Sequence, residues 1–136
     1  ILIVNGHGGN NPVSALAQEL MAEYNDTSIK FHNWWNAPQT WTKIQSIDES
    51  GSHANWMENF PWTRLAHAPA PEGEKPSVDV EMLRAFSPAQ ARDFLGDGSF
   101  GGPWQRPDEE MLAVWDVGVA ETRAALDGPW PAAQDG

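Results

Sequence analysis

The sequence predicts an α/β fold, and the order of elements near its N-terminus carries this prediction. The chain opens on an apolar, β-branched run from Ile1 to Val4, which is typical of a buried strand. A glycine-rich bend from Asn5 to Asn10 leads into a helix that starts near Pro12, and a second strand is expected over Ser28 to Trp35. This order places His7, within the bend, at the carboxyl end of a strand, where open α/β sheets bind their ligands.

The first helix has a recognisable start signal. Asn10 or Asn11 is expected to be the N-cap, and Pro12 suits the first helical position. The apolar residues that follow recur at helical spacing; they are Val13, Leu16, Ala17, Leu20 and Met21. This spacing predicts a helix from Pro12 onward.

Shorter elements are expected in the middle of the chain. Residues 40 to 48 are predicted to form a short helix, and Gly51-Ser52 offers an N-cap for another over Asn55 to Asn59. Proline, glycine and charged residues dominate from Ala66 to Pro76, which indicates an exposed loop. The pattern from Val78 to Phe86 fits a strand or a short helix and does not decide between them.

Two helices are predicted in the C-terminal part. The first runs from Ser87 to about Leu95 and is ended by the run GDGSFGGP. The second opens at Pro107 and continues to Leu126, with Gly128 as its stop signal. Its apolar face comprises Met111, Val114, Trp115, Gly118, Val119 and Ala125. The tail, residues 129–136, is expected to be frayed.

Composition bounds the size and the partners of the chain. Its 136 residues fit one domain, and a formal net charge of −11, from 19 acidic and 8 basic residues, argues against nucleic acid and anionic membranes as partners. The absence of cysteine excludes disulfides and thiolate metal ligands. No apolar run reaches the roughly 20 residues of a membrane span, and the first residues lack a signal-peptide pattern. We expect a cytoplasmic protein. Eight tryptophans indicate a site or interface lined with aromatic surface.

His7 is the first candidate site residue. The flanking glycines, Gly6, Gly8 and Gly9, let the backbone approach a ligand closely and supply N–H groups. A neutral imidazole on a stiff strand end is also a good metal ligand. The alternative is a histidine that sits in a turn without a role in binding.

His53 and Glu58 form the second candidate pair. On one continuous helix a spacing of five residues would turn the two side chains roughly 140° apart. If the helix starts near Asn55 instead, His53 precedes it and the two side chains can converge on one ligand. A purely structural pair is the alternative interpretation.

Two further patterns are weaker. Gly96 to Gly101 matches GxGxxG, but it follows a predicted helix rather than a strand, which argues against dinucleotide binding. The His-Gly-Gly sequence after a strand resembles the oxyanion loop of some serine hydrolases, but the chain contains no Gly-x-Ser-x-Gly motif. His67 is expected to be solvated in its loop, and His32 to be packed or structural on its strand.

These residues together resemble the creatininase family of metal-dependent amidohydrolases. The resemblance rests on the apolar strand that enters N-G-H-G-G-N, at Ile1 to Asn10, and on an H-A-[GN]-x-x-E element at His53 to Glu58. The pair Trp34-Trp35 and a glycine-rich turn before a long terminal helix, from Gly96 to Leu126, are also similar. The resemblance covers nearly the whole chain but only the C-terminal portion of a family member.

The resemblance implies a three-layer α/β/α fold with a mainly parallel sheet, of which this chain supplies only part. It also implies two divalent metal ions, such as zinc, manganese or iron, and hydrolysis of an amide C–N bond in a small substrate. His7 matches the family's metal-ligand histidine, and His53 matches a histidine implicated in proton transfer. Glu58 matches an acidic position that ligates the second metal or orients a water.

Substrate contacts are expected from the aromatic residues near these motifs. Trp34, Trp35 and Trp56 would wall a flat or cyclic amide, with the backbone of Gly8 and Gly9 close to it. Creatininase itself has a metal-binding glutamate where this chain has Gly9, which argues against creatinine as the substrate.

The family's remaining ligands lie in a motif like E-x-H-G-x-H-L-P-x-x-T-D, which these 136 residues do not contain. We therefore expect an N-terminal fragment or a second subunit to supply them, and the assembled unit to form a homo-oligomer. Ile1 would then lie in the middle of a domain, as in a processed fragment, a split-gene subunit or a truncated chain. The competing hypothesis is a non-catalytic, acidic, tryptophan-rich module that binds a partner.

Overall fold

The two predicted strands form a parallel pair. Strand β1 (Leu2–Asn5) lies beside β2 (Lys30–Asn33) in a register that sets Ile3 opposite Phe31 and Asn5 opposite Asn33. The connection between them contains helix α1 (Val13–Glu23), as parallel pairing requires a crossover. The second strand is shorter than predicted, because residues 34–36 turn into a 3-10 helix, η2 (Trp34–Asn36).

This structure is a computed structural model that describes residues 1–131 and divides into two units. The first unit comprises residues 1–43 and the C-terminal segment from residue 115, and the second comprises residues 44–114. Helices α2 (Pro38–Ile47) and α5 (Asp108–Asp127) each contribute residues to both units. None of the helices within residues 1–131 is long and apolar enough to cross a membrane.

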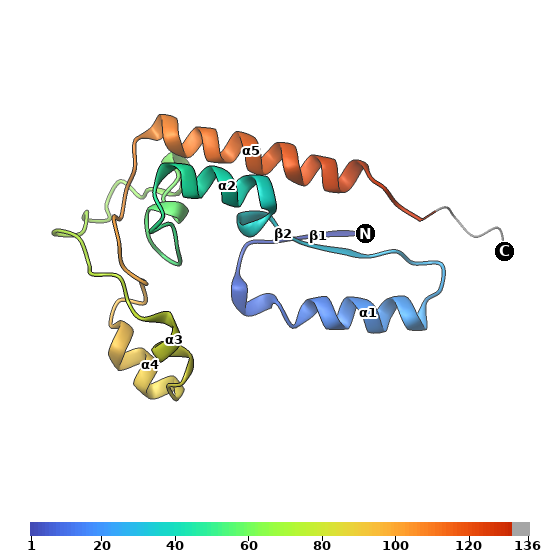
Figure 1. The fold of residues 1–136 in the computed structure, drawn as a ribbon, viewed down its shortest axis with the longest axis horizontal. Helices are drawn as coiled ribbons and strands as arrows, with labels where there is room; N and C mark the ends of the chain where they lie inside the picture. Colours follow the sequence, from blue (N-terminus) through green and yellow to red (C-terminus); the bar gives the residue numbers. More distant parts are fainter. Residues whose placement is uncertain (132–136) are drawn as a thin grey trace. The chain divides into compact units, whose positions relative to one another are not determined.

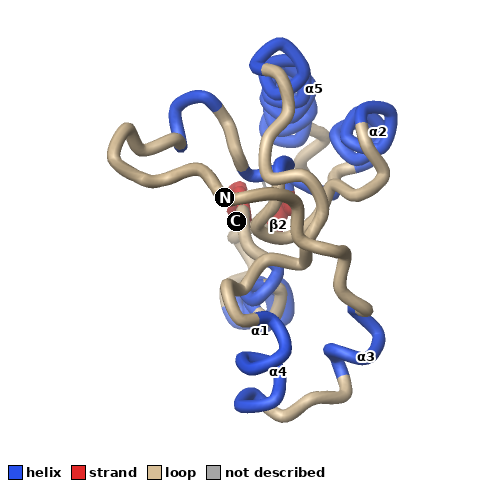
Figure 2. Tube along the Cα trace, turned by 90° about the vertical axis from the view of Figure 1, so that its left-hand side faces the viewer, coloured by secondary structure: helices blue, strands red, loops and turns tan. Residues whose placement is uncertain are grey.

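Within the first unit, helices flank the strand pair. Figures 1 and 2 place α1 on one side of the strands and α5 on the other. A mixture of helices with a small parallel sheet is consistent with the predicted α/β fold. The described sheet has two strands, so the full three-layer arrangement stays a prediction.

The start of α1 differs from the prediction. Neither Asn10 nor Asn11 caps it; Pro12 is the N-cap residue and makes no side-chain cap hydrogen bond. The Asn10 amide donates to Asn5 Oδ1 at 3.0 Å, and Asn11 Oδ1 accepts from Asn33 Nδ2 at 3.1 Å. The N-cap prediction is wrong because both asparagine side chains bind residues at the ends of the strands instead.

A carboxylate from α5 caps the start of α2. Glu121 Oε1 accepts from the Gln39 amide at 3.0 Å, while Oε2 accepts from the Thr40 amide and hydroxyl, both at 2.9 Å. Thr40 is fully buried, so these bonds satisfy amides at the helix N-terminus that would otherwise be orphaned. Burial alone would raise the pKa of Glu121, but the hydrogen bonds from Gln39 and Thr40 outweigh it and lower that pKa below its ordinary value.

The second unit is built around a small apolar core. Its buried residues come from α2, from the 3-10 helix η3 (Trp56–Glu58), from the segment just after η3 and from the start of α5; they are Ile44, Trp56, Met57, Phe60, Met111 and Val114. A second 3-10 helix, η4 (Pro61–Thr63), follows η3. Burial at Met111 and Val114 confirms the predicted apolar face of the last helix at its start, whereas Trp115 and Val119 are 44% and 45% exposed.

Two short helices complete the second unit. The undecided stretch after residue 77 forms a helix, α3 (Val80–Arg84), which begins where Asp79 accepts from the Met82 amide. The predicted helix at Ser87 is confirmed as α4 (Pro88–Leu95), and Ser87 and Gln90 form a reciprocal capping box.

The glycine run after α4 encloses a lysine. Lys75 Nζ donates to the carbonyls of Leu95 and Ser99, both at 2.7 Å, and to Asp97 Oδ1 at 2.6 Å. Gly101 has a φ of +86°, and a Cβ there would lie 2.2 Å from the Pro76 carbonyl oxygen. This run is therefore a tight turn around an ammonium group.

The predicted frayed tail, residues 129–136, lies partly outside the described residues. Residues 132–136 are not described, but Trp130 is: its indole N–H donates to the Leu126 carbonyl at 2.6 Å, and Lys30 Nζ lies 4.1 Å from the ring centroid. This start of the tail is attached to the end of α5 and to β2.

The Glu121 cap predicts a stability effect that depends on pH. Glu121→Gln should lower the free energy of unfolding at pH 7 by about 1–3 kcal/mol, because it removes a charged acceptor from partly buried amides. The folded-state pKa is lowered, so the stabilisation is present above the ordinary glutamate pKa and is lost as pH falls through the folded-state value. Urea unfolding from pH 7 down to about pH 3 measures this. The control is the exposed Glu19→Gln on α1; equal stability of both variants at pH 7 would contradict the cap.

Candidate functional site

His7 lies directly beyond the carboxyl end of β1, as predicted. The residue is exposed and extended, with φ −143° and ψ 128°, and it precedes a 3-10 turn, η1 (Gly8–Asn10). Because β1 and β2 are parallel and in register, the end of β2 at Asn33 lies next to this turn. The His7 loop therefore stands at the carboxyl edge of the strand pair.

A buried asparagine network holds this loop. Asn5, 3% exposed, donates from its side-chain amide to the His7 carbonyl at 2.8 Å and to Asn33 Oδ1. Its Oδ1 accepts from the His7 amide at 3.3 Å and from Asn10 Nδ2 at 3.0 Å. The sequence analysis missed Asn5 and Asn33 as residues that form the site. Asn5 stands within the glycine-rich motif and could have been considered, whereas Asn33 lies 28 positions away and no local pattern indicates that the two bond.

Two tryptophans pack against the glycines of the loop. A Cβ on Gly6 would lie 3.5 Å from Trp34 Nε1, and one on Gly118 would lie 3.2 Å from Trp34 Cε3. Trp35 approaches Gly8, where a Cβ would lie 3.9 Å from its Cζ2 atom. The two predicted substrate-binding tryptophans of the first unit thus lie against the loop that contains His7, Gly8 and Gly9.

A mainly apolar groove runs along β1 in the first unit. It has a volume of about 530 Å³ and lies between the strand and one face of α5. Its lining includes Leu2, Val4, Trp34, Trp115, Val119 and Leu126. Several of these side chains remain exposed, among them Val4 at 52% and Leu126 at 55%. Trp34 therefore contacts both the His7 loop and this groove.

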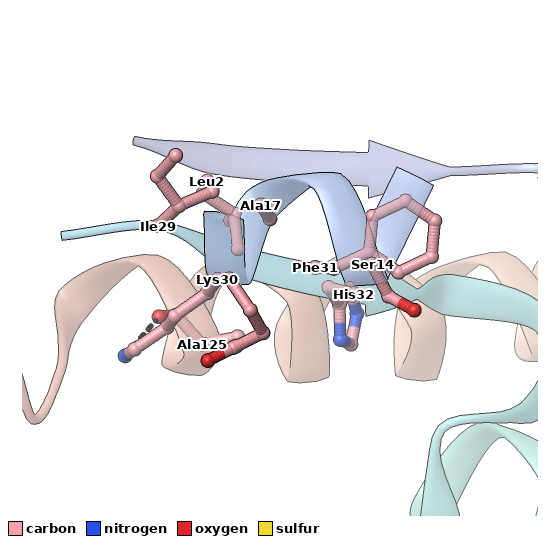
Figure 3. A pocket seen from close by; sticks show the side chains of 9 residues that line it. Leu2, Ser14, Ala17, Ile29, Lys30, Phe31, His32 and Ala125 are labelled. Atoms are coloured by element: carbon pink, nitrogen blue, oxygen red, sulfur yellow. Dashed lines mark hydrogen bonds between the residues drawn. The ribbon is translucent and has the colours of Figure 1, made fainter. Parts of the chain in front are cut away.

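A second, more polar pocket lies along β2 (Figure 3). Figure 3 shows Lys30 and His32 from the strand with Ser14 from α1 and Ala125 from α5. Lys30 Nζ donates to the Ala125 carbonyl at 2.8 Å, and His32 Nε2 lies 3.0 Å from Thr122 Oγ1. These contacts attach the strand to α5, which agrees with the packed or structural role expected for His32.

His53 and Glu58 converge in the second unit. The two are separated by 3.5 Å between His53 Nδ1 and Glu58 Oε1, and the same carboxylate oxygen accepts from the Ala54 amide at 3.0 Å. They meet because η3 begins only at Trp56, so His53 precedes the helix. Asn55 is the N-cap and accepts from the Met57 amide, which corrects the N-cap predicted at Gly51-Ser52.

The backbone next to His53 is strained. Ala54 has a φ of +53°, a left-handed conformation that costs an L-residue about 1–2 kcal/mol. The hydrogen bond from its amide to Glu58 and the contact of the His53 ring with Phe100, at 4.9 Å between centroids, hold this turn. Strained residues of this kind cluster at active sites and ligand-binding segments.

Trp56 has a different environment from Trp34 and Trp35. It is fully buried in the core of the second unit, and its indole Nε1 has no hydrogen-bond partner among the described residues. A side chain with no exposed surface packs the core, and a substrate would contact it only after the core opened. Its predicted role in substrate binding has no support in this geometry.

The candidate residues thus form two groups. His7, Gly8, Gly9, Trp34 and Trp35 belong to the first unit, whereas His53, Trp56 and Glu58 belong to the second. The expectation that both groups face one cleft stays a prediction. Within residues 1–131, no group of three or more histidine, aspartate or glutamate side chains could hold a metal ion. The described side chains alone therefore do not fit a complete metal centre.

Comparisons with known proteins bear on these two groups of residues. A family model named Creatininase and described as creatinine amidohydrolase matches residues 1–126. No curated protein and no solved structure matches the chain.

The strained turn predicts an unusual response to glycine. Ala54→Gly should raise the free energy of unfolding by up to about 1 kcal/mol, because glycine adopts a positive φ without steric cost. The same change at the exposed Ala66, which is not among the positive-φ residues, should lower it by roughly 0.5 kcal/mol. Chemical denaturation of both variants measures the difference, and a loss of stability at both positions would show that Ala54 is not strained.

Proposed function

Because the chain belongs to the creatininase family, we propose that it acts in the metal-dependent hydrolysis of an amide C–N bond in a small substrate. The observation that carries this proposal is the family match over residues 1–126, which includes an exposed His7 at the carboxyl end of a parallel strand. Family members are typically dependent on divalent metals, and two such ions, zinc, manganese or iron, are proposed here.

His7 is proposed as one metal ligand. The other ligands are proposed to come from a polypeptide segment that is not part of these 136 residues. A divalent metal supplies this chemistry by polarising the amide carbonyl and lowering the pKa of bound water. A single exposed imidazole does not complete such a centre, so an N-terminal fragment or a second subunit is proposed to bring the remaining carboxylates and histidine.

His53 is proposed to transfer a proton to the leaving nitrogen, with Glu58 as its positioning residue. A carboxylate at Nδ1 favours the tautomer protonated there, which assigns proton transfer to Nε2. Glu58 also accepts from the Ala54 amide, so both contacts support an orienting role rather than the predicted alternative of ligating a metal.

A planar or cyclic amide is the proposed substrate class. Trp34 and Trp35 provide flat apolar surface around the His7 loop. Gly8 leaves the backbone open to close approach, whereas the predicted contact at Gly9 is covered by the His7 imidazole. Trp56 is left out of the proposed site because it is fully buried.

The strand pair supports the proposed partner polypeptide. Parallel sheets occur with helices on both faces and further strands beside them, whereas β1 pairs only with β2 among the described residues. Val4 is 52% exposed, and the apolar groove along β1 passes under α5, where a further strand would bury it. The same groove favours a second candidate function, a non-catalytic module that binds a partner.

Replacing the two histidines tests the proposed roles. His7→Ala should lose at least one equivalent of bound metal and nearly all amide hydrolysis. His53→Gln should keep the metal and lower kcat by a factor on the order of 10² to 10⁴, as expected for lost acid–base catalysis. Metal analysis and turnover of the assembled protein measure both, with the exposed His67→Ala as control. Full metal content and activity in His7→Ala would sink the ligand assignment, and a wild type without stoichiometric metal would favour the partner-binding module.

The partner is tested by native mass spectrometry. A second polypeptide of roughly 80 to 130 residues, enough to complete one ordinary α/β domain, should travel with this chain. Val4→Lys should release it, because a charge would enter the apolar groove, whereas Leu65→Lys, at an exposed position of the second unit, should not. A monomeric chain that hydrolyses amides by itself would contradict the proposal.

A further inference from the structure

The His7 imidazole is folded over Gly9. A Cβ built on Gly9 would lie 2.7 Å from His7 Nε2, which is closer than real Cβ contacts, and 3.0 Å from His7 Cδ2, which is tighter than most of them. Gly9 is not among the glycines with positive φ, so its backbone conformation is open to any L-residue. The turn itself does not require a glycine at position 9. The imidazole does, because it occupies the space that a Gly9 side chain would fill.

Asn5 fixes the main chain of the same histidine on both sides. Its Oδ1 accepts from the His7 amide, and its Nδ2 donates to the His7 carbonyl. Its two remaining bonds, to Asn10 and Asn33, use up the four hydrogen bonds that an amide can make. A carboxylate at this buried position would lose both donors and face the Asn33 oxygen with a lone pair.

We propose that Asn5 and Gly9 are positioning residues for His7: the Asn5 amide fixes its backbone and the bare Cα of Gly9 receives its ring. This inference rests on the proposed role of His7 as a ligand for a divalent cation. An exposed side chain normally keeps its rotamer freedom, and ordering it costs conformational entropy. Such ordering is useful when a ligand atom must be ready before the cation arrives.

The neighbouring glycine offers a matched control. Gly8 also lacks a positive φ, and a Cβ there would make an ordinary 3.9 Å contact with Trp35 Cζ2. Gly8→Ala should therefore leave the imidazole in place, whereas Gly9→Ala must displace it. Asn5→Asp tests the backbone clamp, with Asn25→Asp, at an exposed position in the turn after α1, as its control.

The experiment is NMR of the full chain, with Zn²⁺ alone as the probe. In the wild type, NOEs are expected between the His7 ring protons and the Gly9 α-protons. Gly9→Ala should shift the His7 ring resonances at constant pH while leaving the Asn5 side-chain amide signals in place, and Gly8→Ala should change neither. Asn5→Asp should remove the amide signals and move the ring, and Asn25→Asp should do neither.

Added Zn²⁺ should perturb the His7 ring resonances in the wild type. The apparent Kd for Zn²⁺ should be raised at least roughly tenfold in Gly9→Ala and in Asn5→Asp.

The outcomes separate this inference from the proposed function. Missing wild-type NOEs, or His7 ring resonances in Gly9→Ala that match the wild type, would overturn the positioning role whatever zinc does. A displaced ring in Gly9→Ala, together with no effect of Zn²⁺ on His7 in the wild type, would support the positioning role and overturn the ligand role. The NOE measurement needs no variant, so it decides the question even if Gly9→Ala or Asn5→Asp fails to fold.

Discussion

The parallel register between β1 and β2 is the constraint on which the candidate site in the first unit depends. It sets Asn5 opposite Asn33, so both carboxyl ends lie together and the two side-chain amides can bond. The His7 loop is then anchored to two strands rather than to one. An antiparallel pair would have placed the ends of the two strands at opposite edges, and the asparagine network would not form.

Elements with a local signal could be predicted from the sequence. The capping box at Ser87 and the strand before the His7 loop are both specified by residues within a few positions of each other. The start of α1 was predicted wrongly, because Asn11 bonds to Asn33 across 22 positions, and this competes with capping. The Glu121 cap of α2 spans 81 positions to Thr40, and no pattern in one sequence reports such a bond.

The residues of the candidate site also separate into those that a local sequence signal predicts and those that distant contacts determine. The place of His7 follows from a strand and a glycine bend that adjoin it, so sequence reasoning predicts it. The convergence of His53 and Glu58 was predicted only conditionally, since it depends on where a helix begins and on a left-handed alanine. Trp34 and Trp56 cannot be told apart by residue type, because the difference between lining a groove and filling a core is set by distant neighbours.

Within residues 1–131, β1 pairs with β2 alone, and its other edge bears on how the protein behaves at high concentration. A short apolar strand with open main-chain groups is a template for edge-to-edge aggregation between copies. The formal net charge of −11 opposes this by mutual repulsion of the copies near neutral pH. That repulsion weakens as the carboxylates are protonated near pH 4, so aggregation through the edge of β1 is opposed less under acid conditions.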